Sequence, residues 1–276
     1  MKISVIIPAY NCENTIERCI DSLLCQRGAE LEIIAVNDGS SDQTLRKLNA
    51  YGEKIKVISI SNSGVAGARN AGLVQAEGEF LLFLDSDDFF RENAVRRLME
   101  AQRLHDADIV HFRYEHVHPD GSIYVPKCQI REDFYVEKRD FPGRIYPMFW
   151  KGIYLNSVCM SMFRKSVVQE FRFCTELKTA EDALFSLAAF TNAKSAEFIS
   201  DILYEYTQSG DGMTGSGISI FQKYRDNFAF ARETASKLRT WGMNTPKNYA
   251  AVYLRTVRVT LDKAGRMLKK IKDVQS

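Results

Sequence analysis

The sequence predicts an α/β fold, in which a mostly parallel, Rossmann-like sheet is flanked by helices and followed by a C-terminal helical extension. Short apolar, β-branched runs alternate with segments whose apolar residues recur at helical spacing, which is the pattern of repeated βα units. Each of the first four runs ends in polar, turn-forming residues, and ligands of such sheets bind at the carboxyl ends of the strands. From residue 218 onward the pattern is helical, with breaks near Gly242 and Pro246.

The first half of the chain supplies four predicted strands and four predicted helices. The strands are continuous apolar runs, typical of strands buried on both faces, over residues 3–7, 31–36, 56–60 and 80–84. The helices cover residues 16–24 with Asn14 as N-cap, 42–51 with Gly52 at the end, 65–76, and 93–105. Polar loops that follow four strands on one edge of a sheet describe a binding cleft.

The second half of the chain is less regular. Pro119-Asp120-Gly121 predicts a turn between strands at residues 109–114 and 123–125. We also expect a strand over 158–163, a helix over 183–190, an extended segment over 198–206, and a flexible segment at Gly210, Gly212, Gly215 and Gly217. The expected domains are residues 1–210, in halves 1–115 and 116–210, and a helical extension over 211–276.

Composition argues against several function classes. The net charge of +2 over 276 residues gives no reason to expect a nucleic-acid partner. No stretch approaches the roughly 18 apolar residues of a membrane span. The apolar run at the N-terminus is also too short for a signal peptide, so we expect a cytoplasmic protein. The six cysteines include no Cys-x-x-Cys pair, which argues against a zinc site and suits a reducing compartment.

The sharpest local signal is Asp85-Ser86-Asp87-Asp88, directly after a buried strand. Three carboxylates at one strand end repel one another unless a cation lies among them. Oxygen ligands suit Mg²⁺ or Mn²⁺, which are usually shared with substrate phosphates. The alternative is a helix N-terminus, where acidic residues are favoured by the helix dipole.

Two further loops carry candidate donor-binding residues. Asp38, in the turn over residues 37–42, could bond a nucleotide base or ribose, while Ser41 or Asp42 could cap the next helix. The small residues over 64–72 could instead serve close packing of helix on sheet. Arg69 and Asn70 go beyond that packing role, because polar side chains at a helix N-terminus can meet an anionic ligand.

Glu181-Asp182 precedes the expected helix over residues 183–190. An acceptor hydroxyl is a poor nucleophile and needs a carboxylate that takes its proton during attack, so this pair could supply a general base. The alternative is a capped helix start.

Five motifs that occur in order along about residues 1–200 resemble glycosyltransferase family 2, whose members are inverting enzymes with the GT-A fold. The motifs are residues 3–11, 36–42, 67–72, 83–88 and Glu181-Asp182-x-x-Phe185. The resemblance implies transfer of a sugar from a nucleotide-sugar, expected to be a UDP-sugar, to a hydroxyl of a glycan or lipid-linked acceptor. Surface polysaccharide synthesis is the expected setting.

The resemblance also implies the roles of individual residues. The donor would be bound by Pro8, Ala9, Tyr10, Asn11, Asp38, Arg69, Asn70, Asp85, Ser86 and Asp87. Asp85 and Asp87 would hold Mg²⁺ or Mn²⁺, Asp182 would be the catalytic base, and Glu181 would lie near the acceptor or donor sugar. Acceptor contacts are expected among the aromatic residues of 126–176, Trp150 included, although such residues more often form core.

The sequence departs from the family pattern in two places. All four histidines precede Asp182, so the histidine that some relatives supply downstream as a metal ligand is missing. Tyr204-Glu205-Tyr206 is not followed by the basic residue often found there, and the Gln-x-x-Arg-Trp motif of processive synthases is absent. The alternatives left open are a sugar-nucleotide nucleotidyltransferase and a non-catalytic relative that only binds nucleotide.

Residues 255–273 combine apolar residues at helical spacing with seven basic and two acidic residues, a balance of +5. Such a helix could bind an anionic membrane surface peripherally. The alternatives are a solvated helix packed on the domain and a contact with another subunit of a homo-oligomer.

Overall fold

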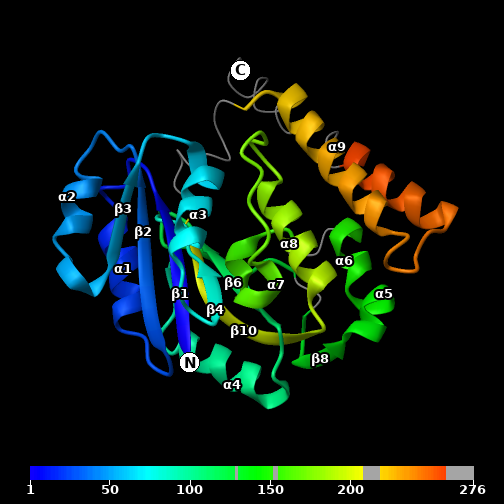
Figure 1. The fold of residues 1–276 in the computed structure, drawn as a ribbon, viewed down its shortest axis with the longest axis horizontal. Coiled ribbons are helices and arrows are strands. Elements are labelled where there is room, and N and C mark those ends of the chain that lie inside the picture. Colours follow the sequence, from blue (N-terminus) through cyan, green and yellow to red (C-terminus); the bar gives the residue numbers. More distant parts are fainter. Residues whose placement is uncertain (128–129, 152–154, 208–217, 259–276) are drawn as a thin grey trace.

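A single mixed sheet forms the centre of the computed structural model, which describes residues 1–127, 130–151, 155–207 and 218–258 (Figure 1). The strand order is β3-β2-β1-β4-β9-β6-β10-β5, and β7 and β8 pair with β6 and β10 respectively. The first four strands are parallel and follow the 3-2-1-4 order of a nucleotide-binding half. The expected α/β class with a mostly parallel sheet is therefore confirmed.

The strands are β1 (Lys2–Ala9), β2 (Glu30–Asp38), β3 (Lys56–Ile60), β4 (Phe80–Phe83), β5 (Phe89–Phe90), β6 (Ile109–Val117), β7 (Ile123–Tyr124), β8 (Phe134–Glu137), β9 (Ser161–Arg164) and β10 (Ser195–Thr207). The helices are α1 (Ile16–Leu24), α2 (Thr44–Asn49), α3 (Gly64–Gln75), α4 (Ala94–His105), α5 (Phe141–Arg144), α6 (Tyr146–Lys151), α7 (Lys165–Val168), α8 (Glu181–Asn192) and α9 (Ile220–Lys237). Short 3₁₀ helices cover Gly52–Lys54, Lys138–Asp140 and Val158–Met160.

The central strand β1 is buried from Ile3 to Ala9, as its continuous apolar sequence predicts. It pairs with β2 on one side and β4 on the other, both in parallel. Helices α1 and α2 lie on one side of this part of the sheet and α3 on the other (Figure 1). The loops that follow β1, β2, β3 and β4 therefore meet at one sheet edge, where the sequence places its polar residues.

Several local expectations need correction. Helix α1 has Thr15, not Asn14, at its N-cap position, and no side chain caps it. Helix α2 ends at Asn49 because the chain turns into a 3₁₀ helix, in which Gly52 has a φ of +57°. The strand expected over 158–163 begins as a 3₁₀ helix, and only its second part, β9, is extended.

The aromatic stretch over residues 126–156 largely builds core. Tyr146 and Phe149 of α6 are 1% and 0% exposed, and Tyr146 stacks on Trp241 with ring centroids 3.9 Å apart. Phe149 packs against Phe190 of α8 and Phe230 of α9. These aromatic side chains therefore join α6 to the C-terminal helices, and the core alternative is the correct one for them.

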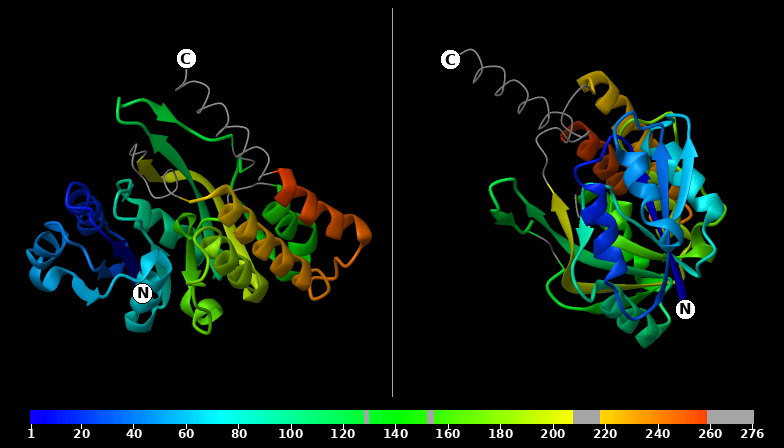
Figure 2. Two further views of the ribbon diagram at one scale, coloured as in Figure 1. Left: turned by 90° about the horizontal axis from the view of Figure 1, so that it is seen from above. Right: turned by 90° about the vertical axis from the view of Figure 1, so that its left-hand side faces the viewer.

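The expected helical extension is present as α9, which packs on α8, and a further helical segment over residues 246–258 (Figure 2). Most of the basic helix expected over 255–273 lies outside the described residues, as do the four glycines from 210 to 217. Within the described parts of the chain, no helix combines the length and the apolar character that crossing a membrane would require.

Helix α3 approaches β1 closely because a glycine faces the strand. A Cβ atom added at Gly72 would lie 2.5 Å from Cγ2 of Ile6, whereas Ala66 and Ala68 already fill the available space as buried residues. The packing reason expected for the small residues of 64–72 is thus confirmed. The position of α3 matters for the site, because α3 also carries Arg69.

We predict that Gly72→Ala lowers the free energy of unfolding by about 1–3 kcal/mol, since the new methyl group overpacks the contact with Ile6. Gly143→Ala is the matched control, because a Cβ at that helical glycine meets nothing within 4 Å. The control should be neutral or slightly stabilising. Equal urea midpoints for the two variants would show that α3 has room to move.

Candidate active site

In the acidic loop after β4, Asp88 is buried, whereas Asp85 and Asp87 are partly exposed. Asp88 is only 1% exposed, and its oxygens accept hydrogen bonds from the Tyr204 hydroxyl at 2.6 Å and the Thr207 backbone N–H at 2.7 Å. The Asp85 side chain is 33% exposed, and Asp87 is half-buried. Asp88 thus fixes the loop to β10, which leaves Asp85 and Asp87, the two expected metal ligands, as the carboxylates of this loop that are partly exposed.

The two remaining carboxylates suit a divalent cation. Burial and the neighbouring charge of Asp85 raise the pKa of Asp87. The two carboxylates therefore repel each other, and a bound cation would relieve this repulsion. Among the described residues, no group of three or more metal-ligating side chains lies close enough together to hold an ion alone. Mg²⁺ or Mn²⁺ held here by Asp85 and Asp87 would therefore need further oxygen ligands from a bound diphosphate and water.

A buried arginine joins this loop to the start of α8. Arg69 is 2% exposed, and its guanidinium donates to Asp85 Oδ1 at 2.8 Å and, through a second nitrogen, to Asp182 Oδ1. Glu181 Oε1 lies 3.6 Å from the same nitrogen. Residues of three motifs that are up to 113 residues apart in sequence thus meet at the Arg69 guanidinium.

Asp182 has the environment of a general base. Burial raises its pKa, the Arg69 guanidinium lowers it, and Glu181 and Asp85 raise it again, which leaves the pKa at about 7. A carboxylate with a pKa near the working pH is well matched to proton transfer. Glu181 and Asp182 also begin α8, so the expected helix start and the expected base occupy the same residues.

Asn70 binds the chain that leads to α8. Its amide nitrogen donates to the Phe173 carbonyl at 2.9 Å, and its amide oxygen accepts from the Phe173 N–H at 2.7 Å. Its predicted contact with the nucleotide stays a prediction, and the structure gives it this backbone contact in addition.

The loops after β1 and β2 are clamped to each other. Asn11, which has a φ of +46°, accepts the Ser41 N–H at 2.9 Å through its side chain, and its own N–H donates to Ser40 Oγ at 3.1 Å. Asp42 accepts the N–H groups of Glu13 and of Thr44, the first residue of α2, but the N-cap position of α2 is Gln43 and neither Ser41 nor Asp42 occupies it. This part of the sheet edge is therefore held by bonds between two loops.

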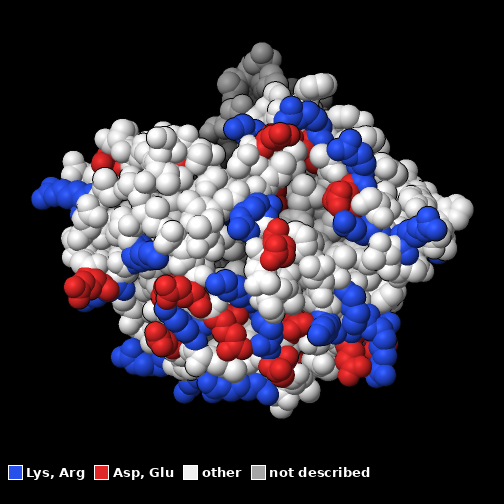
Figure 3. Space-filling model, viewed as in Figure 1, with Lys and Arg blue, Asp and Glu red and all other residues white. Residues whose placement is uncertain are grey.

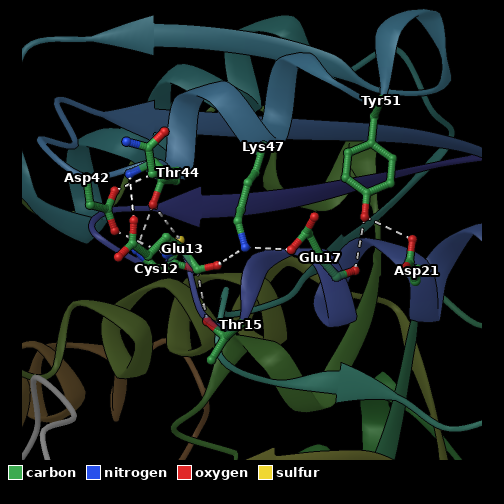
Figure 4. Close-up of polar contacts among 10 residues, drawn as sticks. Cys12, Glu13, Thr15, Glu17, Asp21, Asp42, Thr44, Lys47 and Tyr51 are labelled. Atoms are coloured by element: carbon green, nitrogen blue, oxygen red, sulfur yellow. Dashed lines mark hydrogen bonds and ion pairs between the residues drawn. The ribbon is translucent and has the colours of Figure 1, made fainter.

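Figure 4 shows the contacts of Asp42 with Glu13 and Thr44, together with further contacts between the α1 and α2 regions. Lys47 of α2 donates to the Glu13 carbonyl at 2.7 Å and pairs with Glu17 of α1 at 2.6 Å. Further along, the Tyr51 hydroxyl donates to Asp21 at 2.9 Å. These contacts fix α2 on α1 and, with them, the loop that carries Tyr10 and Asn11.

Asp38 braces the loop between β3 and α3. It is 3% exposed, and its carboxylate accepts the N–H groups of Ser63 at 2.7 Å and Gly64 at 2.8 Å. Pro8 and Ala9 end β1, and Tyr10 beyond them is 47% exposed. The expected base contacts of Asp38 and Tyr10 stay predictions, but both residues do lie at the expected sheet edge.

Two further residues support the site, and the sequence analysis gave neither of them this role. Arg18 of α1 donates to the Asp87 carbonyl at 3.0 Å and to Thr207 Oγ1 at 2.7 Å, while its guanidinium lies over the Phe89 ring. Tyr204 reaches Asp88 from β10. No sequence pattern marks Arg18, whereas the Tyr-x-Tyr at 204–206 did mark Tyr204.

Trp150, the expected acceptor contact, is partly buried and packs against the core from α6. The acceptor role of Trp150 stays a prediction. The histidine positions are structural in part: His111 is buried in β6 beside Ser161 Oγ at 2.9 Å, and burial lowers its pKa to about 3.

Comparison with known proteins identifies the same region. Residues 4–172 match the family model for glycosyl transferase family 2. The chain is 34% identical to the poly(ribitol-phosphate) β-N-acetylglucosaminyltransferase TarS of Staphylococcus aureus, over 77% of this chain and 36% of TarS. It is 30% identical to the uncharacterized glycosyltransferase EpsJ of Bacillus subtilis, over 77% of this chain and 62% of EpsJ.

The fold matches as well. The crystal structure of S. aureus TarS residues 1–349 in complex with UDP-GlcNAc aligns with a TM-score of 0.72 at 31% identity, covering 84% of this chain and 66% of that chain. This similarity confirms the GT-A type fold. The chain spans less than two thirds of the length of the curated relatives TarS and EpsJ.

We predict that Arg69→Met destabilises the fold by about 3–5 kcal/mol, because it leaves the buried Glu181 and the partly buried Asp85 and Asp182 without their counter-charge. The loss should be larger at pH 8 than at pH 5. Asp182 would lose the neighbour that lowers its pKa, and a folded-state pKa above the unfolded value of about 3.9 weakens the fold as the pH rises through it.

Arg97→Met is the control, since Arg97 pairs with the more exposed Asp133 and Asp201. It should cost less and show no such trend between the two pH values. Urea unfolding at pH 5 and pH 8 measures both variants, and equal losses at the two pH values would contradict the assigned charge balance.

Proposed function

The chain belongs to glycosyltransferase family 2, and on that premise we propose that it transfers a sugar from a UDP-sugar to a hydroxyl of a glycan or lipid-linked acceptor. The observation that carries this proposal is the Arg69 bridge, which holds Asp85 of the acidic loop and Asp182 of α8 on one guanidinium. This bridge supports the proposal, because a single displacement requires the residue proposed to face the donor diphosphate and the residue proposed as general base to lie side by side.

The proposed chemistry is one displacement at the anomeric carbon. Asp182 takes the proton of the acceptor hydroxyl, the new oxygen–carbon bond forms, and the bond from the anomeric carbon to the diphosphate breaks. With one base and no covalent intermediate, the configuration at that carbon inverts. Arg69 holds the Asp182 carboxylate in place and keeps its pKa from rising further.

Asp85 and Asp87 would hold Mg²⁺ or Mn²⁺ against the donor diphosphate. When bound, the cation supplies Lewis-acid stabilisation of the charge that develops on the leaving group. Arg18 and Asp88 keep the loop that carries both ligands against β10.

The named relatives support the donor and the acceptor class. TarS is named as a β-N-acetylglucosaminyltransferase and crystallised with UDP-GlcNAc, and a Bacillus spizizenii relative, 32% identical, is named as a poly(ribitol-phosphate) β-glucosyltransferase. A UDP-hexose or UDP-N-acetylhexosamine donor and a role in surface polysaccharide synthesis fit these names. We also propose that the enzyme acts at the cytoplasmic face of the membrane, where residues 255–273 would bind anionic lipid.

The competing functions explain less of the site. A sugar-nucleotide nucleotidyltransferase opens with a glycine-rich loop after its first strand, whereas β1 here leads into Pro8, Ala9, Tyr10 and Asn11. A non-catalytic relative has no need of a buried carboxylate with a pKa of about 7. Release of free sugar from UDP-sugars, with and without metal, separates the three functions.

We predict that Asp87→Ala lowers transfer by at least about 100-fold, the scale for losing one preorganised electrostatic contact in the transition state. The melting temperature should stay close to that of the wild type. Asp88→Ala is the contrasting variant: it leaves Tyr204 and the Thr207 N–H without their buried acceptor and should lower the melting temperature. Near-normal turnover of Asp87→Ala in buffer with Mn²⁺ would refute the metal assignment.

We predict that Asp182→Asn keeps UDP affinity but loses transfer by about 10²–10⁴-fold, because the amide cannot take a proton. In the wild type, the transfer rate should rise with pH and level off above an inflection near pH 7, since the base acts only when ionised. Initial rates from pH 5 to pH 9 measure this. If Asp182→Asn is unimpaired, the base lies elsewhere, with Glu181 the first candidate.

A further inference from the structure

A buried carboxylate on α9 holds the chain just before the proposed base. Asp226 is 0% exposed, and its Oδ2 accepts hydrogen bonds from the N–H groups of Lys178 and Thr179, both at 3.0 Å. The Thr179 hydroxyl donates to the same oxygen at 3.2 Å, and Gln222 donates to Oδ1 at 2.7 Å. Three of these four hydrogen bonds come from the two-residue segment that ends three residues before Asp182.

A second side chain of α9 grips the same segment. Arg225, next to Asp226, donates to the Glu176 carbonyl at 3.1 Å and lies 3.5 Å from Asp226 Oδ1. Helix α9 therefore contacts the backbone of residues 176–179 through both an acceptor and a donor. This part of the chain connects to α8, on which α9 packs (Figure 1).

The residue between this segment and the base has a strained backbone. Ala180 has a φ of +76° and a ψ of 3°, in the left-handed region that L-residues other than glycine and asparagine seldom adopt. Such a conformation costs of order 1–3 kcal/mol and persists only where the surroundings enforce it. No side chain caps α8, so the hydrogen bonds to Asp226 are the fixed point next to this turn.

We propose that Asp226 is a positioning residue for the transfer reaction, which acts by fixing residues 178–179 so that the strained turn at Ala180 presents Asp182 to Arg69 and the acceptor. The inference rests on the proposed function, because Asp182 must be the base for its position to matter. It gives the C-terminal helix α9 a part in catalysis, although α9 follows the family-model match by about 50 residues.

A cavity lies beside α9, and Asp226 is not one of its lining residues. The cavity has a volume of about 860 Å³ between α8, α9 and residues 171–177, and its charged lining residues are Arg172, Glu176, Arg225, Arg232, Glu233 and Lys237. Charged side chains of both signs border this side of the molecule (Figure 3). Because the cavity and Asp226 share α9, the test below uses a control on the cavity side of the same helix.

The test compares Asp226→Ala, Asp226→Asn and Glu233→Ala with the wild type. Glu233→Ala is the matched control, since it removes a carboxylate of α9 that forms an exposed pair with Lys237. With UDP-GlcNAc as donor, Asp226→Ala should lower kcat for sugar release by about 10- to 100-fold, the scale for misplacing a catalytic group by about 1 Å. The Kd for UDP of Asp226→Ala and of Glu233→Ala should each stay within about twofold of the wild-type value.

Asp226→Asn keeps one acceptor oxygen for the two N–H groups and should recover most of kcat. Amide hydrogen exchange gives a readout that needs no turnover: the amides of Lys178 and Thr179 should exchange faster in Asp226→Ala than in Glu233→Ala. If Asp226→Ala does not fold, Thr179→Val removes one of the three bonds and should lower kcat by about two- to fivefold, again with unchanged UDP affinity.

The outcomes separate the two proposals. A wild-type chain that releases no sugar from any UDP-sugar overturns the proposed function, while faster exchange at Lys178 and Thr179 would still show the hold on the segment. A kcat of Asp226→Ala or Thr179→Val equal to that of Glu233→Ala overturns the positioning role. A parallel loss of kcat and UDP affinity also overturns it, because it would reveal a general loss of structure.

Discussion

The buried guanidinium of Arg69 is the contact on which the site depends. An arginine that is 2% exposed is stable only when its charge is paired, and here the partners come from the loop after β4 and from the first turn of α8. Helix α3 must therefore lie close enough to the sheet for Arg69 to reach both. Gly72 permits that approach, so a packing detail of the first half sets the geometry of the chemistry.

The second half of the fold carries the proposed base, Asp182 of α8, and adds an antiparallel strand to the parallel sheet of the first half. Strand β9 lies between β4 and β6 and pairs antiparallel with both. The sheet then continues to β10, from which Tyr204 and Thr207 reach back to Asp88. The acidic loop is thus fixed from the second half, while the base is fixed to the first half through Arg69, so neither half builds the site alone.

The βα units of the first half could be predicted because each is a long run with one clear period. The bounds of β3 agree to the residue, and those of β1, β4, α3 and α4 agree within a few residues. Strands such as β5, with two residues, and β8, with four, are too short to show a period and are formed by pairing with the distant β10. The motifs led to the expected site residues, whose roles stay predictions, whereas Arg18 and Asp226, which bond to distant backbone groups, carry no local signal.

The structure also gives a physical distinction among aspartates that look alike in the sequence. Asp38, Asp42, Asp88 and Asp226 each accept backbone N–H groups from another segment, so their charge is used to fix a loop. Asp85 and Asp182 face a shared guanidinium, whose charge can be divided differently once an anionic donor and a hydroxyl arrive. A backbone N–H cannot be redistributed in this way without unfolding a turn. Asp85 and Asp182, on which the proposed function rests, are therefore paired with a side chain, whereas the carboxylates bound to backbone hold the surrounding loops in place.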